Sequence, residues 1–372
     1  MTNDPTSFSR RTFLAAGAAF AAGSLAHGSP RIRTDDKAGA KRPVVGDGAF
    51  TYECIHDWAT PPAEIAFGNT HGVAVDRDGL VYIKHTVHAS SAKPDAICVF
   101  DPQGAFVRSF GAEFRGGAHG LLLSREPAGD FLYLADCGRG VVVKTDLRGN
   151  EVWRRGVPDA SGLYGAAGEY KPTNVAIVPH DASSPGAKPF AGHFFVADGY
   201  GKSWIHHYDA DANYVRSFGG PGKERGQVAC PHGIFLDTRQ GEPRLVVADR
   251  SNHRLQYFSL DGRHLGLTTA ELRSPCHFDQ RGAGAGGVGG GDARGPLLLI
   301  PDLDARVTIF DRDDKLVVHL GDGENYGLRD KPREQFVPGR FIAPHSACWT
   351  AEGDILVVEW VEVGRVTKLR HV

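Results

Sequence analysis

Histidine is the residue type in this sequence with the clearest chemical meaning. The chain has 17 histidines among 372 residues but a single methionine. Six short apolar segments follow similar polar turns, and five of them carry histidine at their head. These residues are His71, His119, His232, His277 and His345, with Thr173 in the sixth place. Neutral imidazole is the usual nitrogen ligand of zinc, copper, iron and nickel. The pattern therefore predicts a metal site wherever the six heads meet.

The segments that carry these residues belong to an internal repeat. Each is followed by a second and a third apolar segment, and the first five units have a fourth. The units recur about every 45–70 residues, a little longer than the ~40–50 of common propeller blades. The 48 glycines and 22 prolines suit many short strands joined by turns. Six such units predict an all-β fold, a six-bladed β-propeller.

The last unit of the repeat lacks its fourth strand. The chain ends at Val372 after three apolar segments, while residues 50–58 form an apolar segment that belongs to no unit. We expect this N-terminal segment to pair with the last blade as its outer strand. The pairing would close the ring and remove an exposed sheet edge.

In such a propeller, the heads of the first strands lie around the axis on one face. Blades 2, 4 and 6 carry His119, His232 and His345, which sixfold geometry places about 120° apart. Three histidines on one side of an ion leave positions open for water or substrate, so we predict that these three bind the metal. The other three heads are then additional axial or supporting groups. An alternative stays open, in which the axial histidines only hydrogen-bond with one another and with water.

The loops that follow the second strands lie on the same face. They bring His85, His88, Tyr200 and Arg250 to it. Tyr200 and Arg250 stand out because each places a large functional group in a turn. The loops and the histidine ring are therefore candidates for one site on that face.

The N-terminus has the form of an export signal. Residues 9–14 read Ser-Arg-Arg-Thr-Phe-Leu, a twin-arginine pattern, and a weakly apolar run precedes a cleavage-like site before His27. We predict a signal peptide at 1–26, a flexible linker at 27–48 and the propeller at 49–372. The mature protein would be periplasmic or secreted. No later stretch reaches the ~18 apolar residues of a membrane-spanning helix.

Composition narrows the class of partner. Lys and Arg total 42 against 44 Asp and Glu, a net charge of −2. This balance argues against a nucleic-acid or membrane-surface binder, whose affinity would rest on clustered basic residues. We expect a monomer that takes a small-molecule or peptide substrate. The six cysteines form no C-x-x-C motif, and whether Cys230 and Cys276 pair or bind metal stays open.

The loop motif Ala248-Asp249-Arg250 and the strands around it resemble NHL repeats, which form propellers. Over residues 70–370 the chain resembles the catalytic core of the peptidyl-α-hydroxyglycine α-amidating lyases. In that family, zinc histidines stand in His-Gly and Pro-His motifs at the heads of three alternate blades. The corresponding residues are His119, His232 and His345.

The resemblance also assigns catalytic residues. The catalytic tyrosine of the family follows Asp-Gly after a Pro-Thr-Asn/Asp-Val-Ala strand, which corresponds to Tyr200 after residues 172–176. Its catalytic arginine corresponds to Arg250. A second active-site arginine is replaced by His85, which we expect to act in its place.

Other positions depart from the family pattern. Ser346 stands where the family has an aspartate that binds calcium, which argues against a Ca²⁺ ion here. Ala343 replaces a methionine, and Gly201 stands where a cysteine forms a disulfide beside the tyrosine. These changes indicate an altered substrate pocket.

The chemistry implied by the resemblance is the cleavage of a carbinolamide, N–CH(OH)–COOH, into an amide and glyoxylate. Zn²⁺ would polarise the hydroxyl oxygen, Tyr200 would act as general base, and Arg250 would hold the carboxylate. Two other classes of function stay open. One is a non-catalytic propeller scaffold for interactions, and the other is a copper or iron redox protein built on the histidine ring.

Overall fold

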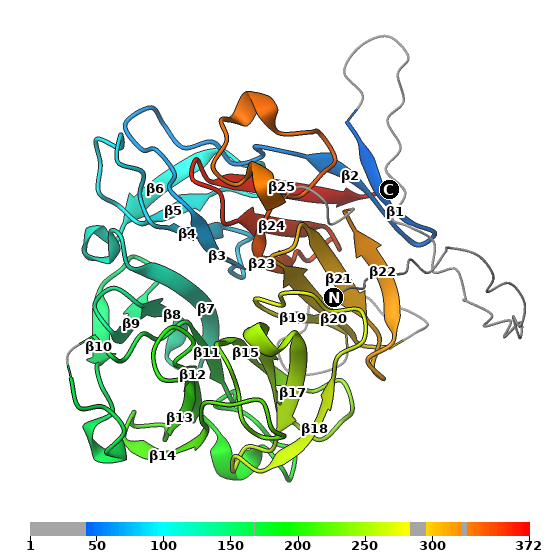
Figure 1. Cartoon of the computed structure of the whole chain (residues 1–372). Coiled ribbons are helices and arrows are strands. Elements are labelled where there is room, and N and C mark those ends of the chain that lie inside the picture. Colours follow the sequence, from blue (N-terminus) through cyan, green and yellow to red (C-terminus); the bar gives the residue numbers. More distant parts are fainter. Residues whose placement is uncertain (1–41, 167, 283–294, 322–325) are drawn as a thin grey trace, which may run out of the picture.

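The computed structural model describes residues 42–166, 168–282, 295–321 and 326–372 (Figure 1). The predicted signal peptide and most of the predicted linker lie outside these ranges. Within them, no helix is long and apolar enough to cross a membrane. The helical segments of the described part are single 3-10 turns. They are η1 (Ala112–Phe114), η2 (Asp159–Ser161), η3 (Lys188–Phe190), η4 (Arg250–Asn252), η5 (Tyr326–Leu328) and η6 (Arg333–Gln335).

Six antiparallel sheets stand around a common centre as the blades of a propeller, which confirms the predicted fold class (Figure 1). Blade 1 contains β3 (Thr70–Val75), β4 (Val81–His85), β5 (Ile97–Phe100) and β6 (Phe106–Phe110). Blade 2 contains β7 (Ala118–Glu126), β8 (Gly129–Asp136), β9 (Val141–Asp146) and β10 (Glu151–Arg155). Blade 3 contains β11 (Asn174–Ile177), β12 (Phe194–Ala197), β13 (Trp204–Tyr208) and β14 (Tyr214–Gly219).

The second half of the ring repeats this order. Blade 4 contains β15 (Pro231–Asp237), β16 (Arg244–Asp249), β17 (Arg254–Phe258) and β18 (His264–Thr268). Blade 5 contains β19 (Asp279–Arg281), β20 (Leu297–Asp302), β21 (Arg306–Phe310) and β22 (Leu316–Leu320). Blade 6 contains β23 (Pro344–Trp349), β24 (Ile355–Glu359) and β25 (Arg365–His371), followed by the N-terminal β2 (Phe50–Ile55) and β1 (Val44–Asp47).

The hydrophobic core lies between the blades. Phe195 of blade 3 belongs to the same buried cluster as Ile234 of blade 4, and Leu299 of blade 5 packs in one cluster with Trp349 of blade 6. Middle strands such as β12 are buried along their whole length because neighbouring blades cover both faces. Such strands read as continuous apolar runs, which is why the repeat is visible in the sequence.

The N-terminal strand closes the ring as predicted. Strand β2 pairs antiparallel with β25, with Cys54 opposite Leu369. The predicted linker was wrong at its C-terminal end, however, because residues 44–47 form β1, which pairs with β2 and adds a fifth strand to blade 6. The reason is burial: Val45 is fully buried opposite Tyr52, so these residues pack instead of remaining in solvent.

We expect Phe50→Ala to weaken this closure. Phe50 is 4% exposed and packs in the cluster between blades 5 and 6. Deleting a buried phenylalanine ring costs about 3–5 kcal/mol, so the free energy of unfolding should fall by that amount in urea denaturation. The control is Val372→Ala at the same end of the sheet, where Val372 N–H donates to the Thr51 carbonyl and the side chain is 62% exposed. Equal stability of the two variants would show that the closing strand contributes little.

Candidate metal centre

Four histidines stand at irregular heads of innermost strands. His71, His119, His232 and His345 are each the second residue of β3, β7, β15 and β23. In each of these strands the pairing register with the next strand shifts across the histidine. A bulge of this kind bends a strand and re-aims a side chain. Because of this irregularity, each imidazole need not follow the regular alternation of side chains between the two faces of the blade.

The structure brings the three predicted metal histidines together. The ring centroids of His119 and His232 are 4.7 Å apart, those of His232 and His345 4.7 Å, and those of His119 and His345 4.8 Å. All three residues are at most 3% exposed. They come from alternate blades, so the near-equilateral triangle follows from the symmetry of the ring.

Backbone carbonyls of the next blade hold these three rings. Nδ1 of His119 donates to the carbonyl oxygen of Thr173 at 2.7 Å, and Nδ1 of His232 donates to that of Cys276 at 2.9 Å. Nδ1 of His345 donates to the carbonyl oxygen of His71, also at 2.9 Å. With Nδ1 protonated in this way, Nε2 is the atom whose lone pair each ring can offer to a metal.

The buried imidazoles on the axis fit a divalent metal ion, although the described group whose ligand atoms all lie within 4.8 Å of one another consists of His71, His119 and His345, without His232. Nε2 of His119 is buried and has no hydrogen-bond partner among the described residues. A buried polar atom without a partner is costly, and a metal ion would satisfy it. Carbonyl groups that orient ligating imidazoles through Nδ1 are the usual outer contacts of metal sites.

The glycines that follow two of the histidines have a positional role. A Cβ on Gly120 would lie 2.4 Å from the Thr173 carbonyl oxygen, and one on Gly233 would lie 2.4 Å from the Cys276 carbonyl oxygen. These are the two carbonyls that orient His119 and His232. Glycine is therefore needed for the neighbouring strand to come close enough to hold the ring, which explains the His-Gly motif.

We expect Gly233→Ala to lower metal affinity although it touches no ligand atom. The added Cβ must push the Cys276 carbonyl away and so misalign His232. Loss of an outer contact of this kind typically costs about 10–100-fold in metal affinity, which competition with a chelator would measure. Gly266→Ala in the same blade is the control, because a Cβ there meets nothing within 4 Å. Similar affinities for the two variants would contradict the role of the carbonyl.

Burial keeps the axial imidazoles neutral. Desolvation lowers the pKa values of His119 and His232 well below the ordinary 6.5, and it lowers the pKa of His345 to about 3. Metal binding requires neutral imidazole. The three rings are thus in the ligating protonation state at neutral pH without any proton loss.

Tyr200 and Arg250 lie at the rim of this centre. The Tyr200 hydroxyl is 3.0 Å from Nε2 of His232, and a guanidinium nitrogen of Arg250 is 3.4 Å from the same hydroxyl. Burial raises the pKa of Tyr200 to about 12, while Arg250 acts in the opposite direction. The two residues line a cavity of about 400 Å³ together with Ser251, Leu303 and other side chains. No axial histidine lines this cavity, and Tyr200 is the residue that both lines it and contacts His232.

Comparison with known proteins finds similar chains among amidating lyases and amidating monooxygenases. No family model matches the chain. It is 27% identical over 323 residues to a probable peptidyl-α-hydroxyglycine α-amidating lyase of Caenorhabditis elegans, covering 81% of this chain and 80% of that protein. The chain resembles the amidating lyases. It is also 24% identical over 225 residues to peptidyl-glycine α-amidating monooxygenase B of Xenopus laevis, covering 54% of this chain but 24% of that longer protein.

Solved structures share the architecture. A streptogramin B lyase aligns with a TM-score of 0.53 at 11% identity, covering 85% of this chain and 97% of that one. Virginiamycin B lyase of Staphylococcus aureus, solved with quinupristin, aligns with a TM-score of 0.50 at 10% identity, covering 86% and 100%. At these identities the likeness concerns the fold alone.

His85, which the resemblance predicted to stand in for a catalytic arginine, is not part of the group. Its side chain is fully buried, and Nδ1 accepts the backbone N–H groups of Gly68 and Val87. Nε2 lies 3.7 Å from the Cys98 sulfur, and the ring packs edge-on against Phe67. Both ring nitrogens are occupied inside blade 1, so the prediction of a catalytic His85 is corrected to a structural role.

Stability should fall as the pH drops below 6.5, because several histidines are buried neutral. Burial lowers the pKa values of His85, His206 and His345 to about 3. Between pH 6.5 and 3 the unfolded chain binds protons that the folded protein excludes, so each group removes about 1.4 kcal/mol of stability per pH unit on acidification. We would measure urea unfolding of the metal-free protein at pH 7 and pH 5. His85→Leu should show a shallower slope, and pH-independent stability would contradict the burial of these rings.

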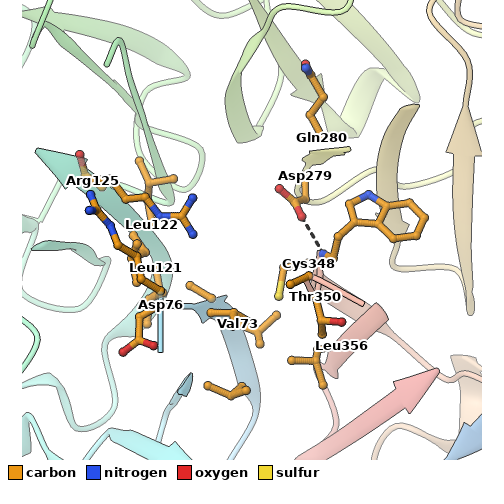
Figure 2. A pocket seen from close by; sticks show the side chains of 18 of the residues that line it. Val73, Asp76, Leu121, Leu122, Arg125, Asp279, Gln280, Cys348, Thr350 and Leu356 are labelled. Carbon is orange, nitrogen blue, oxygen red and sulfur yellow. Dashed lines mark hydrogen bonds between the residues drawn. The ribbon is translucent and has the colours of Figure 1, made fainter. Parts of the chain in front are cut away.

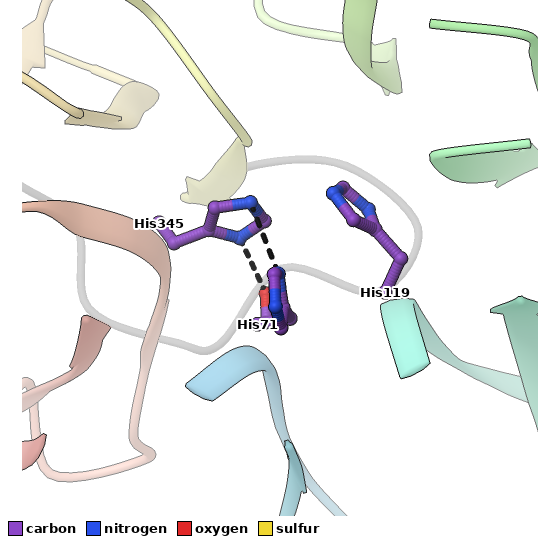
Figure 3. A group of neighbouring side chains, drawn as sticks. All are labelled: His71, His119 and His345. Atoms are coloured by element: carbon purple, nitrogen blue, oxygen red, sulfur yellow. Dashed lines mark hydrogen bonds between the residues drawn. The ribbon is translucent and has the colours of Figure 1, made fainter. Parts of the chain in front are cut away.

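The remaining predicted residues have varied surroundings. Thr173 is buried and orients His119 through its carbonyl. Nδ1 of His277 lies 3.2 Å from the Ser346 hydroxyl, so Ser346, at which the resemblance argued against a calcium site, has an imidazole neighbour. His88 bonds locally to Ser90 and does not join the axial group. His71 does join it, and within the described ranges His71, His119 and His345 form the one group of three or more residues whose ligand atoms all lie within 4.8 Å (Figure 3).

A larger cavity of about 950 Å³ opens at the other end of the innermost strands (Figure 2). His277 lines it from the inside, and Asp279 beside it accepts the backbone N–H of Trp349. This end of the ring is therefore separate in its lining from the face that carries Tyr200 and Arg250. His277 belongs with this cavity more than with the metal centre.

Sequence reasoning missed one charged residue near the site. The Lys84 ammonium is fully buried and donates to the carbonyls of Gly120 and Ala135, which joins blade 1 to blade 2 beside His119. Burial lowers its pKa to about 7. A lysine inside an apolar strand was the available signal. All six cysteines are free, and the Cys230 sulfur accepts a bond from Arg250.

Proposed function

We propose that this protein is a zinc-dependent lyase that cleaves N-acyl-α-hydroxyglycine compounds into an amide and glyoxylate. The observation that carries the proposal is the triangle of His119, His232 and His345 with Tyr200 and Arg250 at its rim. Resemblance to amidating lyases over 81% of the chain supports the same chemistry.

The three imidazoles would hold Zn²⁺ through their Nε2 atoms, and the ion when bound would act as a Lewis acid toward the substrate hydroxyl. The Tyr200 oxygen, 3.0 Å from Nε2 of His232, lies within reach of a hydroxyl held on the axis. Positive charge from Arg250 favours the phenolate form of Tyr200. The guanidinium also offers paired donors for the substrate carboxylate.

The proposed reaction is a proton transfer coupled to one bond cleavage. Tyr200 removes the hydroxyl proton, and the O–H electron pair becomes the second bond of the aldehyde. The C–N bond breaks with its electrons passing to nitrogen, and Tyr200 returns the proton to that nitrogen. Atoms and electrons balance without an oxidant, so the products are a primary amide and glyoxylate.

The direct test is turnover of N-benzoyl-α-hydroxyglycine by the purified protein, with benzamide and glyoxylate measured as products. Metal content is determined on the same sample by elemental analysis. We expect zinc, and equal amounts of the two products. Zinc-loaded protein that releases no glyoxylate would overturn the proposed reaction, and copper or iron in place of zinc would favour redox chemistry.

A further inference from the structure

A fourth imidazole stands at the edge of the proposed zinc triangle. The ring centroid of His71 is 4.5 Å from that of His345 and 4.8 Å from that of His119. Because blade 1 lies between blades 6 and 2, His71 faces the axis from the side opposite to His232. Two triangles of imidazoles therefore share the edge between His119 and His345. Figure 3 shows the triangle that contains His71.

The nitrogen that His71 presents points at a ligand atom. Its Nδ1 lies 3.3 Å from Nε2 of His345. This Nε2 is the atom that His345 would offer to the proposed metal ion. His345 already donates from Nδ1 to the His71 carbonyl, so the 3.3 Å contact carries its proton on His71. Two nitrogens bound at ~2.0–2.1 Å to one tetrahedral ion lie about 3.4 Å apart. The two nitrogens that share this proton are therefore about as far apart as two ligands of one ion would be.

The local backbone of His71 matches that of the triangle. Strand β3 carries the same register shift at its head as β7, β15 and β23. His277, at the corresponding place of blade 5, precedes β19 and bonds instead to Ser346. The bulged heads are thus those of the four clustered histidines.

We propose that His71 is a fourth protein ligand of the metal, bound through Nδ1. The inference rests on the metal centre of the proposed function and adds a residue to it. Coordination requires the ring proton to move from Nδ1 to Nε2, with no net proton release. A tetrahedral ion with four imidazoles has no vacant position, so the substrate oxygen would have to enter as a fifth ligand, as some catalytic zinc sites allow.

The test uses Co²⁺ as a spectroscopic substitute for zinc in the full-length protein. Co²⁺ is titrated into metal-free wild type, His71→Ala and His277→Ala, and the visible absorption and dissociation constant are measured. X-ray absorption then counts the imidazole ligands. We expect four imidazoles in wild type and three in His71→Ala, with affinity at least about tenfold weaker and an altered visible spectrum. His277→Ala should match wild type.

A structural role for His71 predicts a different result. If His71 only covers Nε2 of His345 with its N–H, removing it takes away a competitor, so His71→Ala would bind Co²⁺ equally or more tightly with an unchanged spectrum. That outcome overturns the proposal. His71→Gln serves as the second variant if the alanine protein does not fold, with the same expectations.

The proposed lyase activity is tested by a separate measurement, the release of glyoxylate. Four imidazoles in wild type without glyoxylate would overturn the lyase activity and leave the fourth ligand standing. An unchanged Co²⁺ spectrum in His71→Ala together with turnover by wild type would do the reverse.

Discussion

A His119→Ala variant should lose its bound zinc and lower kcat/KM for N-benzoyl-α-hydroxyglycine by about a thousandfold, or roughly 4 kcal/mol of transition-state stabilisation. His119 is the ligand of choice for this experiment because it belongs to both imidazole triangles, with and without His71. Both triangles contain His119, so the substitution removes one corner from each of them.

The expected effect is large because of the surroundings of His119. Its Nδ1 is held by the Thr173 carbonyl at 2.7 Å, and its Nε2 is the buried atom without a described partner. In the metal-free protein that nitrogen makes no hydrogen bond. Its removal should therefore lower the free energy of unfolding of the metal-free protein by little more than the cost of a small cavity. Elemental analysis, steady-state kinetics and urea unfolding of the metal-free form measure the three quantities.

His277→Ala is the matched control for this experiment, since His277 is also an axial histidine but contacts Ser346. We expect it to keep zinc and activity. If His119→Ala keeps both as well, the triangle is not the metal site and the axial rings only hydrogen-bond with one another.

The sequence alone predicted the propeller because each blade is covered on both faces. Strands such as β12 are buried throughout, so their apolar runs repeat at the spacing of the blades. The spare apolar segment at 50–58 and the missing fourth strand of the last unit together predicted that the N-terminal strand closes the ring. Strand β1 was missed because Val44 and Val45 alone, between a proline and a glycine, are too short to show a strand pattern.

The histidine triangle was predictable from alternate blades, whereas the direction of single side chains was not. His85 and Lys84 are neighbours on β4, and successive side chains of a strand point to opposite faces. His85 turns toward Phe67 and Cys98, while Lys84 turns toward blade 2. The motif resemblance placed His85 at an active-site position. It could not predict which way the side chain of His85, the last residue of β4, would point. The bulges that aim His71 and His119 are likewise a property of the backbone, with the His-Gly pairs as their only trace in the sequence.

Tyr200→Phe should lower kcat by about 10²–10⁴-fold, the usual contribution of a positioned general acid–base group. Zinc content should not change, because the proposed ligands are histidine nitrogens and the Tyr200 oxygen is not among them. KM should change little, since Arg250 remains to hold the carboxylate. Kinetics with N-benzoyl-α-hydroxyglycine and elemental analysis of the same preparation separate these effects.

The control for Tyr200→Phe is Tyr214→Phe, which removes a hydroxyl from the same blade. The Tyr214 hydroxyl bonds to Ser217 on the outer strand β14, far along the blade from the axis, so activity should remain. Burial raises the pKa of the Tyr200 phenol to about 12, and Arg250 opposes that rise. A phenol with so high a pKa is a poor base near neutral pH unless further positive charge lies beside it, so the role of Tyr200 depends on the histidine triangle being loaded. Full activity of zinc-loaded Tyr200→Phe would therefore remove Tyr200 from the mechanism while leaving the metal site intact.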